Sequence, residues 1–472
     1  MVLCNSNGGD FTGRRNALTE GDVFLTLLQF SIPFLLSSLL QALYGASDLF
    51  MVGRFADSAG VCAVATGGQV MQTIASLAIG LTTGGTVLVA KHIGAKNRRE
   101  AAHAVKTALA VFGVLSLALT VLVLLMAGPI CALMQVPAEA SAVARRYLTI
   151  CAFGIVFIIG FNVVSGILRG MGDSRTPLLF MAAACLINVS TDLLFVGVLG
   201  LGAPGAAVST VLAQAAALAL SAAFLLRRGT VGRYRRLRPS FRPGAARELL
   251  GVGVPVALQE GLVNVSFLII TSIVNGTGLY ASAAVGIVEK LIMFSMLPAT
   301  AFSAAVAAMT AQNAGAGLDE RGRRCLRGGV SLSLLFGLAF FACAQVNSAG
   351  LVSVFTGDQN VVLSGMRYLR AYSADSVIVC FVFCINAYLS GCGHPSFPLL
   401  HSLAATFLIR IPLSWLFSRT GSMFLIGTAA PAASLFSLLL CFWFLHSVAD
   451  ETKACTGRRI RTRRPSRAAK SA

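Results

Sequence analysis

The feature that most constrains the fold is a series of apolar runs, each about 20 residues long or longer. A helix of ~20 apolar residues crosses the ~30 Å hydrocarbon layer of a bilayer. Twelve such runs follow one another along the 472 residues, and they are too long for the alternating strands of a membrane barrel. Only 12% of the residues are charged, against about a quarter in soluble domains. The sequence therefore predicts an all-α polytopic membrane protein with twelve transmembrane helices.

The predicted spans cover residues 23–46, 61–90, 104–128, 147–168, 177–198, 205–227, 247–275, 282–311, 328–346, 368–391, 396–418 and 421–448.

The two halves of the chain repeat one another. Arg146-Tyr147-Leu148 recurs as Arg367-Tyr368-Leu369, and further anchors, such as Gly94 with Gly315, hold the same shift of 221 residues. Repeats of this kind mark transporter folds. Six spans per half give both copies the same orientation, so we predict two bundles related by a pseudo-twofold axis along the membrane normal. The predicted divisions are an N-terminal bundle at 1–226, a basic linker at 227–246, a C-terminal bundle at 247–450 and a basic tail at 451–472.

The basic residues indicate the topology. Of the 37 Lys and Arg, 29 fall at the termini, the linker and the loops on one side, and six fall on the other. Because cytoplasmic loops carry an excess of Lys and Arg, we expect a multi-pass protein of the cell membrane with both termini in the cytoplasm. The net charge of +19 thus reflects topology rather than nucleic-acid binding. The basic tail offers a possible contact with anionic lipid headgroups.

The twelve cysteines are scattered, most of them in apolar runs, without zinc spacing or a secreted disulfide pattern. We interpret them as reduced, small apolar side chains. Residues 1–22 have no apolar core, so no cleaved signal peptide is expected. We expect no organic cofactor.

The ionisable residues inside the spans are the functional candidates, because lipid does not solvate them. Asp48 lies near the end of the first span, and Asn188 and Asp192 share one face of the fifth span because they are four residues apart. Two carboxylates in one dry site share a proton or bind a cation. Their counterparts in the second half are Ile270, Ile409 and Leu413. We therefore expect ion coupling in the first bundle alone, with Na⁺ as a possible ligand of Asp48, Asn188 and Asp192.

Several segments are similar to signatures of the multidrug and toxic-compound extrusion (MATE) family. They are Pro33 with Gln41-Ala42-Leu43-Tyr44, Asp48 and Met51-Val52-Gly53-Arg54 in the first span, Gly94-Ala95, Arg169-Gly170-Met171-Gly172-Asp173 with Thr176-Pro177, and Gln312-Asn313-Ala314-Gly315-Ala316. The resemblance covers about residues 20–450. It implies two six-helix bundles around a central cleft that opens alternately to each side. It also implies antiport of bulky, often cationic and amphipathic compounds against H⁺ or Na⁺.

The resemblance adds Thr210 to Asp48, Asn188 and Asp192 as the expected cation-coupling cluster. A midplane carboxylate facing the cleft suits a cationic substrate. We expect the cleft to be lined by Gln41, Tyr44, Glu260, Asn264 and Glu289.

Two further charges lie in the second half. Asp375 and Arg410 fall at equal predicted depth, which favours a buried ion pair. Glu289 and Lys290 are adjacent and point ~100° apart on a helix, so they are poor mutual partners.

Other functions stay open at this stage. The alternatives are a flippase for lipid-linked precursors, an enzyme embedded in the membrane and an ion channel. No nucleophile motif or His–carboxylate set supports the enzyme. The prediction is a secondary-active exporter that acts as a monomer on small organic substrates, with no nucleic-acid partner.

Overall fold

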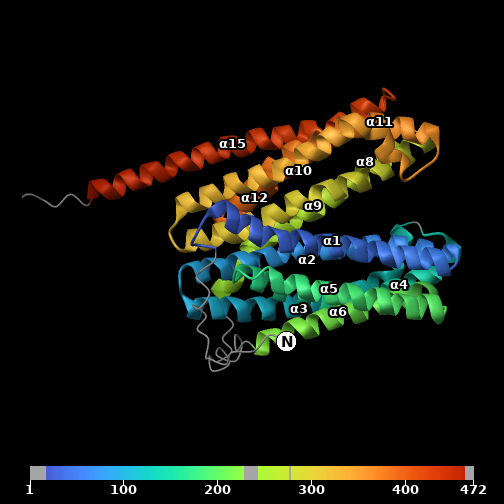
Figure 1. Ribbon diagram of the computed structural model, residues 1–472, viewed down its shortest axis with the longest axis horizontal. Coiled ribbons are helices and arrows are strands. Elements are labelled where there is room, and N and C mark those ends of the chain that lie inside the picture. The colour runs from blue at the N-terminus through green and yellow to red at the C-terminus, as the bar shows by residue number, and fades with distance from the viewer. Residues whose placement is uncertain (1–17, 135, 228–242, 276–277, 463–472) are drawn as a thin grey trace, which may run out of the picture.

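The computed structural model describes residues 18–134, 136–227, 243–275 and 278–462, and every regular element in these ranges is a helix (Figure 1). Eleven described helices are long and apolar enough to cross a membrane, and a bent pair supplies a twelfth span. The predicted class, an all-α protein with twelve spans, is confirmed.

The first half contains α1 (Val23–Phe55), α2 (Ser58–Gly94), α3 (Arg98–Leu133), α4 (Ala138–Gly170), α5 (Arg175–Asp192), the π-helical segment η1 (Leu193–Val198) and α6 (Gly202–Arg227). The second half contains α8 (Pro243–Asn275), α9 (Leu279–Gly315), α10 (Asp319–Ser353), α11 (Gln359–Tyr372), α12 (Asp375–Gly391), α13 (Ser396–Ala404), the π-helical segment η2 (Ala405–Arg410), α14 (Ile411–Ser418) and α15 (Met423–Thr462).

Acidic side chains mark where the helices begin. Asp22 accepts a hydrogen bond from the backbone nitrogen of Leu25 at 2.8 Å, and Asp57 accepts one from that of Gly60 at 2.8 Å. These are N-caps, which pair backbone donors that have no partner inside the helix.

Most helices extend beyond the predicted spans. The 37 residues of α2 measure about 55 Å at 1.5 Å per residue, well above the ~30 Å of hydrocarbon. Helix α8 begins at Pro243, inside the predicted linker, and α15 continues to Thr462, past the predicted start of the tail at 451. The rest of the linker at 228–242 and the tail beyond Thr462 lie outside the described residues, so their predicted roles stay predictions.

The tenth span differs from the expected continuous helix. It consists of α11 and α12, which meet at 43° across Ser373 and Ala374. Asp375 is therefore the first residue of a new helix rather than an interior residue.

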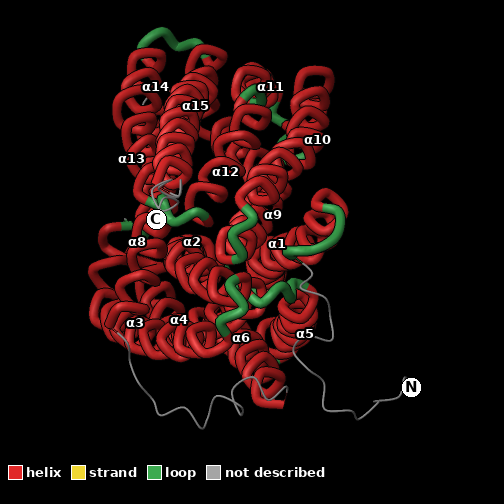
Figure 2. Tube along the Cα trace, turned by 90° about the vertical axis from the view of Figure 1, so that its left-hand side faces the viewer, coloured by secondary structure: helices red, strands yellow, loops and turns green. Residues whose placement is uncertain are grey.

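The first helix of each half crosses to the other half. Leu27 and Phe30 in the early part of α1 pack against Phe302 and Val306 of α9, whereas the later part of α1 packs against α5. In the same way, α8 packs closely against α2 (Figure 2). The segment that precedes α1 also contacts the second half, because Asn313 donates a hydrogen bond to the carbonyl of Leu18 at 3.1 Å.

Helices α2 and α9 come together at their C-terminal ends through two glycines. A Cβ atom on Gly94 would overlap the carbonyl oxygen of Gln312, and one on Gly315 would overlap that of Lys91. The two contacts are copies of each other, since both pairs are related by the 221-residue shift. Only glycine permits this backbone approach.

Candidate functional site

The predicted coupling residues of the first bundle come together in the structure. Asn188 Nδ2 of α5 donates to Asp48 Oδ1 of α1 at 3.0 Å, and Thr210 Oγ1 of α6 donates to Asp48 Oδ2 at 2.8 Å. Asp48 is 5% exposed and Asn188 is fully buried. The carboxylate of Asp48 on α1 thus meets two helices, α5 and α6, whose contacting residues lie 140 and 162 positions further along the chain.

Asp192 completes this cluster one turn after Asn188. It is the last residue of α5 before the π-helical η1, it is fully buried, and it faces Asp48 and Ser209. Neither carboxylate oxygen accepts a hydrogen bond of ordinary geometry from any described residue. The amide oxygen of Asn188 and the hydroxyl of Ser209 are also buried without a described hydrogen-bond partner. Four oxygen atoms are thus buried in the protein interior without a hydrogen bond of ordinary geometry to a described residue.

Tyr44 belongs to the same cluster, although we expected it in the cleft. Its hydroxyl donates to the backbone carbonyl of Thr210 at 3.2 Å and lies beside Gln214. The ring is buried against Phe161 and Met181. The structure therefore places Tyr44 inside the first bundle, where it orders α6 next to Asp48.

Other residues of this region were missed by the sequence reasoning. Tyr147 and Cys151 of α4 are buried and electrostatically coupled to Asp48. Ser209 directly precedes Thr210, so a polar pair at the start of the sixth span could have indicated it. In the sequence, Tyr147 stood out only as one of the residues that match between the two halves of the repeat.

The second half carries an apolar core at the matching place. Ile270, the counterpart of Asp48, is 3% exposed and packs in the cluster of Tyr368, Leu369 and Tyr372. The polar cluster is therefore not required by the bundle fold.

Glu260 and Asn264 lie on α8, about midway along the helix. Asn264 donates to the backbone carbonyl of Glu260 at 2.9 Å, so it does not pair with the carboxylate. The Glu260 carboxylate has no hydrogen bond or ion pair to any described residue, and the residue is exposed on the surface of α8. Gln41 on α1 is half-buried and likewise has no described side-chain partner.

Glu289 of α9 accepts a hydrogen bond from Thr271 Oγ1 of α8 at 3.3 Å. Its neighbour Lys290 is exposed, in line with the expectation that the two point apart.

The expected ion pair between Asp375 and Arg410 is not present: the two described residues have no nitrogen–oxygen contact within 4.0 Å. Asp375 is buried and faces Ser434. Arg410 instead donates to Ser266 Oγ at 3.1 Å and to the Tyr372 hydroxyl at 2.9 Å. The two groups still lie close enough to interact electrostatically, and Asp375 is the first residue of α12, directly after the bend.

The arrangement in the first bundle suits a small cation. Carboxylate, amide and hydroxyl oxygens are the ligands that hard cations prefer, and a proton shared between Asp48 and Asp192 would relieve the same charge. Within the described ranges no group of three or more His, Cys, Asp or Glu side chains has the spacing of a metal site.

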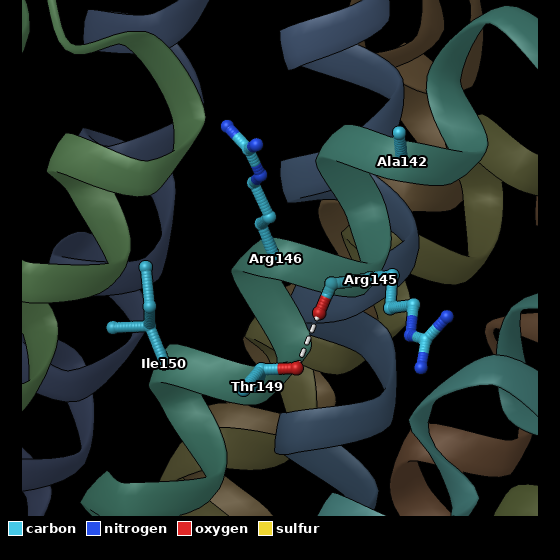
Figure 3. A pocket seen from close by; sticks show the side chains of 5 residues that line it. All are labelled: Ala142, Arg145, Arg146, Thr149 and Ile150. Carbon is cyan, nitrogen blue, oxygen red and sulfur yellow. Dashed lines mark hydrogen bonds between the residues drawn. The ribbon is translucent and has the colours of Figure 1, made fainter.

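A separate depression of about 430 Å³ lies along α4 and is lined by Ala142, Arg145, Arg146, Thr149 and Ile150. In Figure 3 the two arginines point away from each other, and Thr149 Oγ1 donates to the carbonyl of Arg145 at 2.8 Å. None of the candidate residues lines this depression.

Two related bundles of membrane-spanning helices, with a polar cluster buried in one of them, define a membrane transport protein. The MatE family model matches the chain twice, at residues 33–194 and 255–416, and the chain belongs to this family. The family is one of transporters, so the protein is not an enzyme.

Two relatives come from Bacillus subtilis (strain 168). The probable multidrug resistance protein YpnP is 26% identical over 426 residues, which cover 90% of this chain and 95% of the relative. The probable multidrug resistance protein YoeA is 27% identical over 443 residues, covering 91% and 95%. A solved structure of a MATE protein in complex with MaL6 has a TM-score of 0.86 at 22% identity and covers 94% of this chain and 100% of its own, which shows a shared fold.

Proposed function

We propose that the protein exports cationic organic compounds by antiport against H⁺ or Na⁺. The observation that carries the proposal is the set of buried oxygens on Asp192, Asn188 and Ser209 that have no hydrogen bond of ordinary geometry to a described residue. Leaving such groups unpaired is costly, and a bound cation or a proton between the carboxylates removes the cost. The coupling ion, H⁺ or Na⁺, would be held by Asp48 and Asp192 together with the neutral oxygens beside them.

The substrate assignment is supported by two observations. Glu260 is an unpaired carboxylate near the middle of a membrane-spanning helix, and a cation is the ligand that such a group attracts. The two Bacillus subtilis relatives are named probable multidrug resistance proteins. Small organic cations are therefore the substrates that we propose for this chain.

The charge distribution supports an orientation of the protein in the cell membrane. By the positive-inside rule we propose that both termini and the linker lie in the cytoplasm. The ends of α2 and α9 that cross at Gly94 and Gly315 then face the cytoplasm. In this orientation an inward ion gradient drives the organic cation out.

The proposed cycle is alternating access. Binding of the ion neutralises charge in the cluster and changes how α1 packs on α5 and α6, because Asp48 of α1 accepts hydrogen bonds from both of these helices. That change lowers the affinity for the organic cation, and by linkage the organic cation lowers the affinity for the ion. Antiport requires this negative coupling.

The test is dye efflux activity, measured as accumulation of dye inside inverted membrane vesicles, with a proton gradient and a sodium gradient imposed separately. Asp192→Asn should abolish efflux driven by the gradient that drives the wild type. The matched control is Asp57→Asn, an exposed N-cap of α2, where Asn caps as well as Asp. Gradient-driven efflux at the wild-type rate in Asp192→Asn would overturn the proposal, and the gradient that works in the wild type identifies the ion.

A further inference from the structure

One face of α8, called here the stripe, carries three polar residues and one phenylalanine. Glu260, Asn264, Phe267 and Thr271 are spaced four, three and four residues apart, which places them on one side of the helix. From Glu260 to Thr271 the stripe rises about 16 Å at 1.5 Å per residue. It begins at the unpaired Glu260 carboxylate and ends where Thr271 donates to Glu289 at 3.3 Å. The stripe therefore has a carboxylate at each end.

Arg410 lies against the stripe near the Glu289 end. Its guanidinium stacks over the Phe267 ring at 4.6 Å from the centroid, and it is held by Ser266 at 3.1 Å and by Tyr372 at 2.9 Å. These three partners are neutral. A guanidinium remains protonated in proteins, so the fold fixes one permanent positive charge at this place.

The two ends of the stripe therefore differ in charge. Both Glu289 and the buried Asp375 lie close enough to Arg410 to interact with it electrostatically, although neither forms an ion pair with it within 4.0 Å. Glu260 has no charged partner among the described residues. A positive group near Glu260 finds an uncompensated carboxylate, whereas a positive group near Glu289 also meets Arg410.

The sequence repeat shows that this charge is not part of the common fold. The positions of the first half that match Glu260, Glu289 and Arg410 are Ser38, Gly68 and Val189. Arg410 is the last residue of the π-helical η2, a kind of distortion that often occurs at functional sites.

We propose that Arg410 is a specificity-determining residue that restricts the exporter to organic cations with one positive charge. It does so by occupying, with a fixed charge, the place that the second charge of a long dication would take. Without Arg410 the stripe presents two uncompensated carboxylates about 16 Å apart along α8, which suits an extended dication. The inference deepens the proposed function and rests on it.

The test compares two probes in vesicles: tetraphenylphosphonium as the monocation, and decamethonium, whose two quaternary nitrogens are joined by a decamethylene chain. The measured quantity is the concentration of each probe that halves dye efflux. In Arg410→Gln the preference for decamethonium over tetraphenylphosphonium should rise on the order of 10- to 100-fold, the effect of removing a like charge ~6–10 Å away at an effective dielectric constant of ~20.

Three further variants define the cause. Arg410→Lys keeps the charge and should retain the wild-type preference. The double variant Arg410→Gln with Glu289→Gln should lose the gain for decamethonium. The matched control Arg419→Gln removes an arginine that stacks on Trp415 at 3.8 Å, outside the stripe, and should leave the preference as in the wild type.

A second measurement tests the proposal without altering Arg410. Glu260→Gln should weaken inhibition by tetraphenylphosphonium at least fivefold more than Glu289→Gln does, because Arg410 already offsets Glu289. Equal losses, or an unchanged preference in a folded Arg410→Gln protein, would overturn the inference and leave the exporter function standing. Absence of gradient-driven dye efflux in the wild type would overturn both.

Discussion

A methyl group at Gly94 tests how closely α2 and α9 approach each other. The Cβ atom of alanine would overlap the backbone carbonyl oxygen of Gln312, which cannot rotate away as a side chain would. Overpacking typically costs ~1–3 kcal/mol. The matched control is Gly113→Ala in α3, where no atom lies within 4 Å of the new Cβ. Alanine there should stabilise the helix by about 0.5–1 kcal/mol.

The two variants should therefore differ in free energy of unfolding by about 1.5–4 kcal/mol, with opposite signs relative to the wild type. Unfolding by sodium dodecyl sulfate in mixed micelles, followed by circular dichroism, measures the difference. Gly315→Ala should resemble Gly94→Ala, because its Cβ meets the carbonyl of Lys91 in the symmetric contact. If Gly94→Ala and Gly113→Ala agree within about 0.5 kcal/mol, the reasoning from backbone contact is refuted.

Two other predictions concern the polar cluster and its apolar counterpart. Asp48→Ala leaves the donors of Asn188 and Thr210 unpaired and should lower the free energy of unfolding by about 1–3 kcal/mol. The loss in Asp48→Asn should be smaller, because its amide oxygen still accepts a hydrogen bond. A larger loss in Asp48→Asn than in Asp48→Ala, measured in the same titration, would contradict the described hydrogen bonds. Ile270→Asp buries an unpaired carboxylate in the apolar core of the second half and should lower the free energy of unfolding by about 3–5 kcal/mol. If this variant melts at the wild-type temperature, the core must admit water or a cation.

Much of the architecture could be predicted from the sequence because it depends on simple periodicities. Apolar runs long enough to cross a bilayer gave the spans, and the 221-residue shift gave two bundles. The contact between Asp48 and Asn188 could be predicted because both side chains are costly to place in lipid and need polar partners. Thr210 came from the family signature, since a threonine in an apolar helix gives no signal of its own.

The remaining features depend on packing between distant helices. No proline or glycine marks the break between Tyr372 and Asp375, so the bend of 43° had no local signal. The bend and the π-helical η2 both change the direction of side chains, and equal depth in straight helices therefore predicted the wrong partner for Arg410. The contact of Tyr44 with Thr210 had no local signal either, because it depends on how α6 packs against α1.

The crossing of α1 to the second half has a consequence for how the protein is made. The hydrogen bond between Leu18 and Asn313 joins residues 295 positions apart, and Phe30 has its partners on α9. A ribosome must therefore synthesise most of the chain before the first helix reaches its final neighbours. Until then the apolar side of α1 is covered by lipid or by a chaperone. A fragment that ends after α6 would keep Leu27 and Phe30 unpacked, and co-expression of the second half would be needed to complete it.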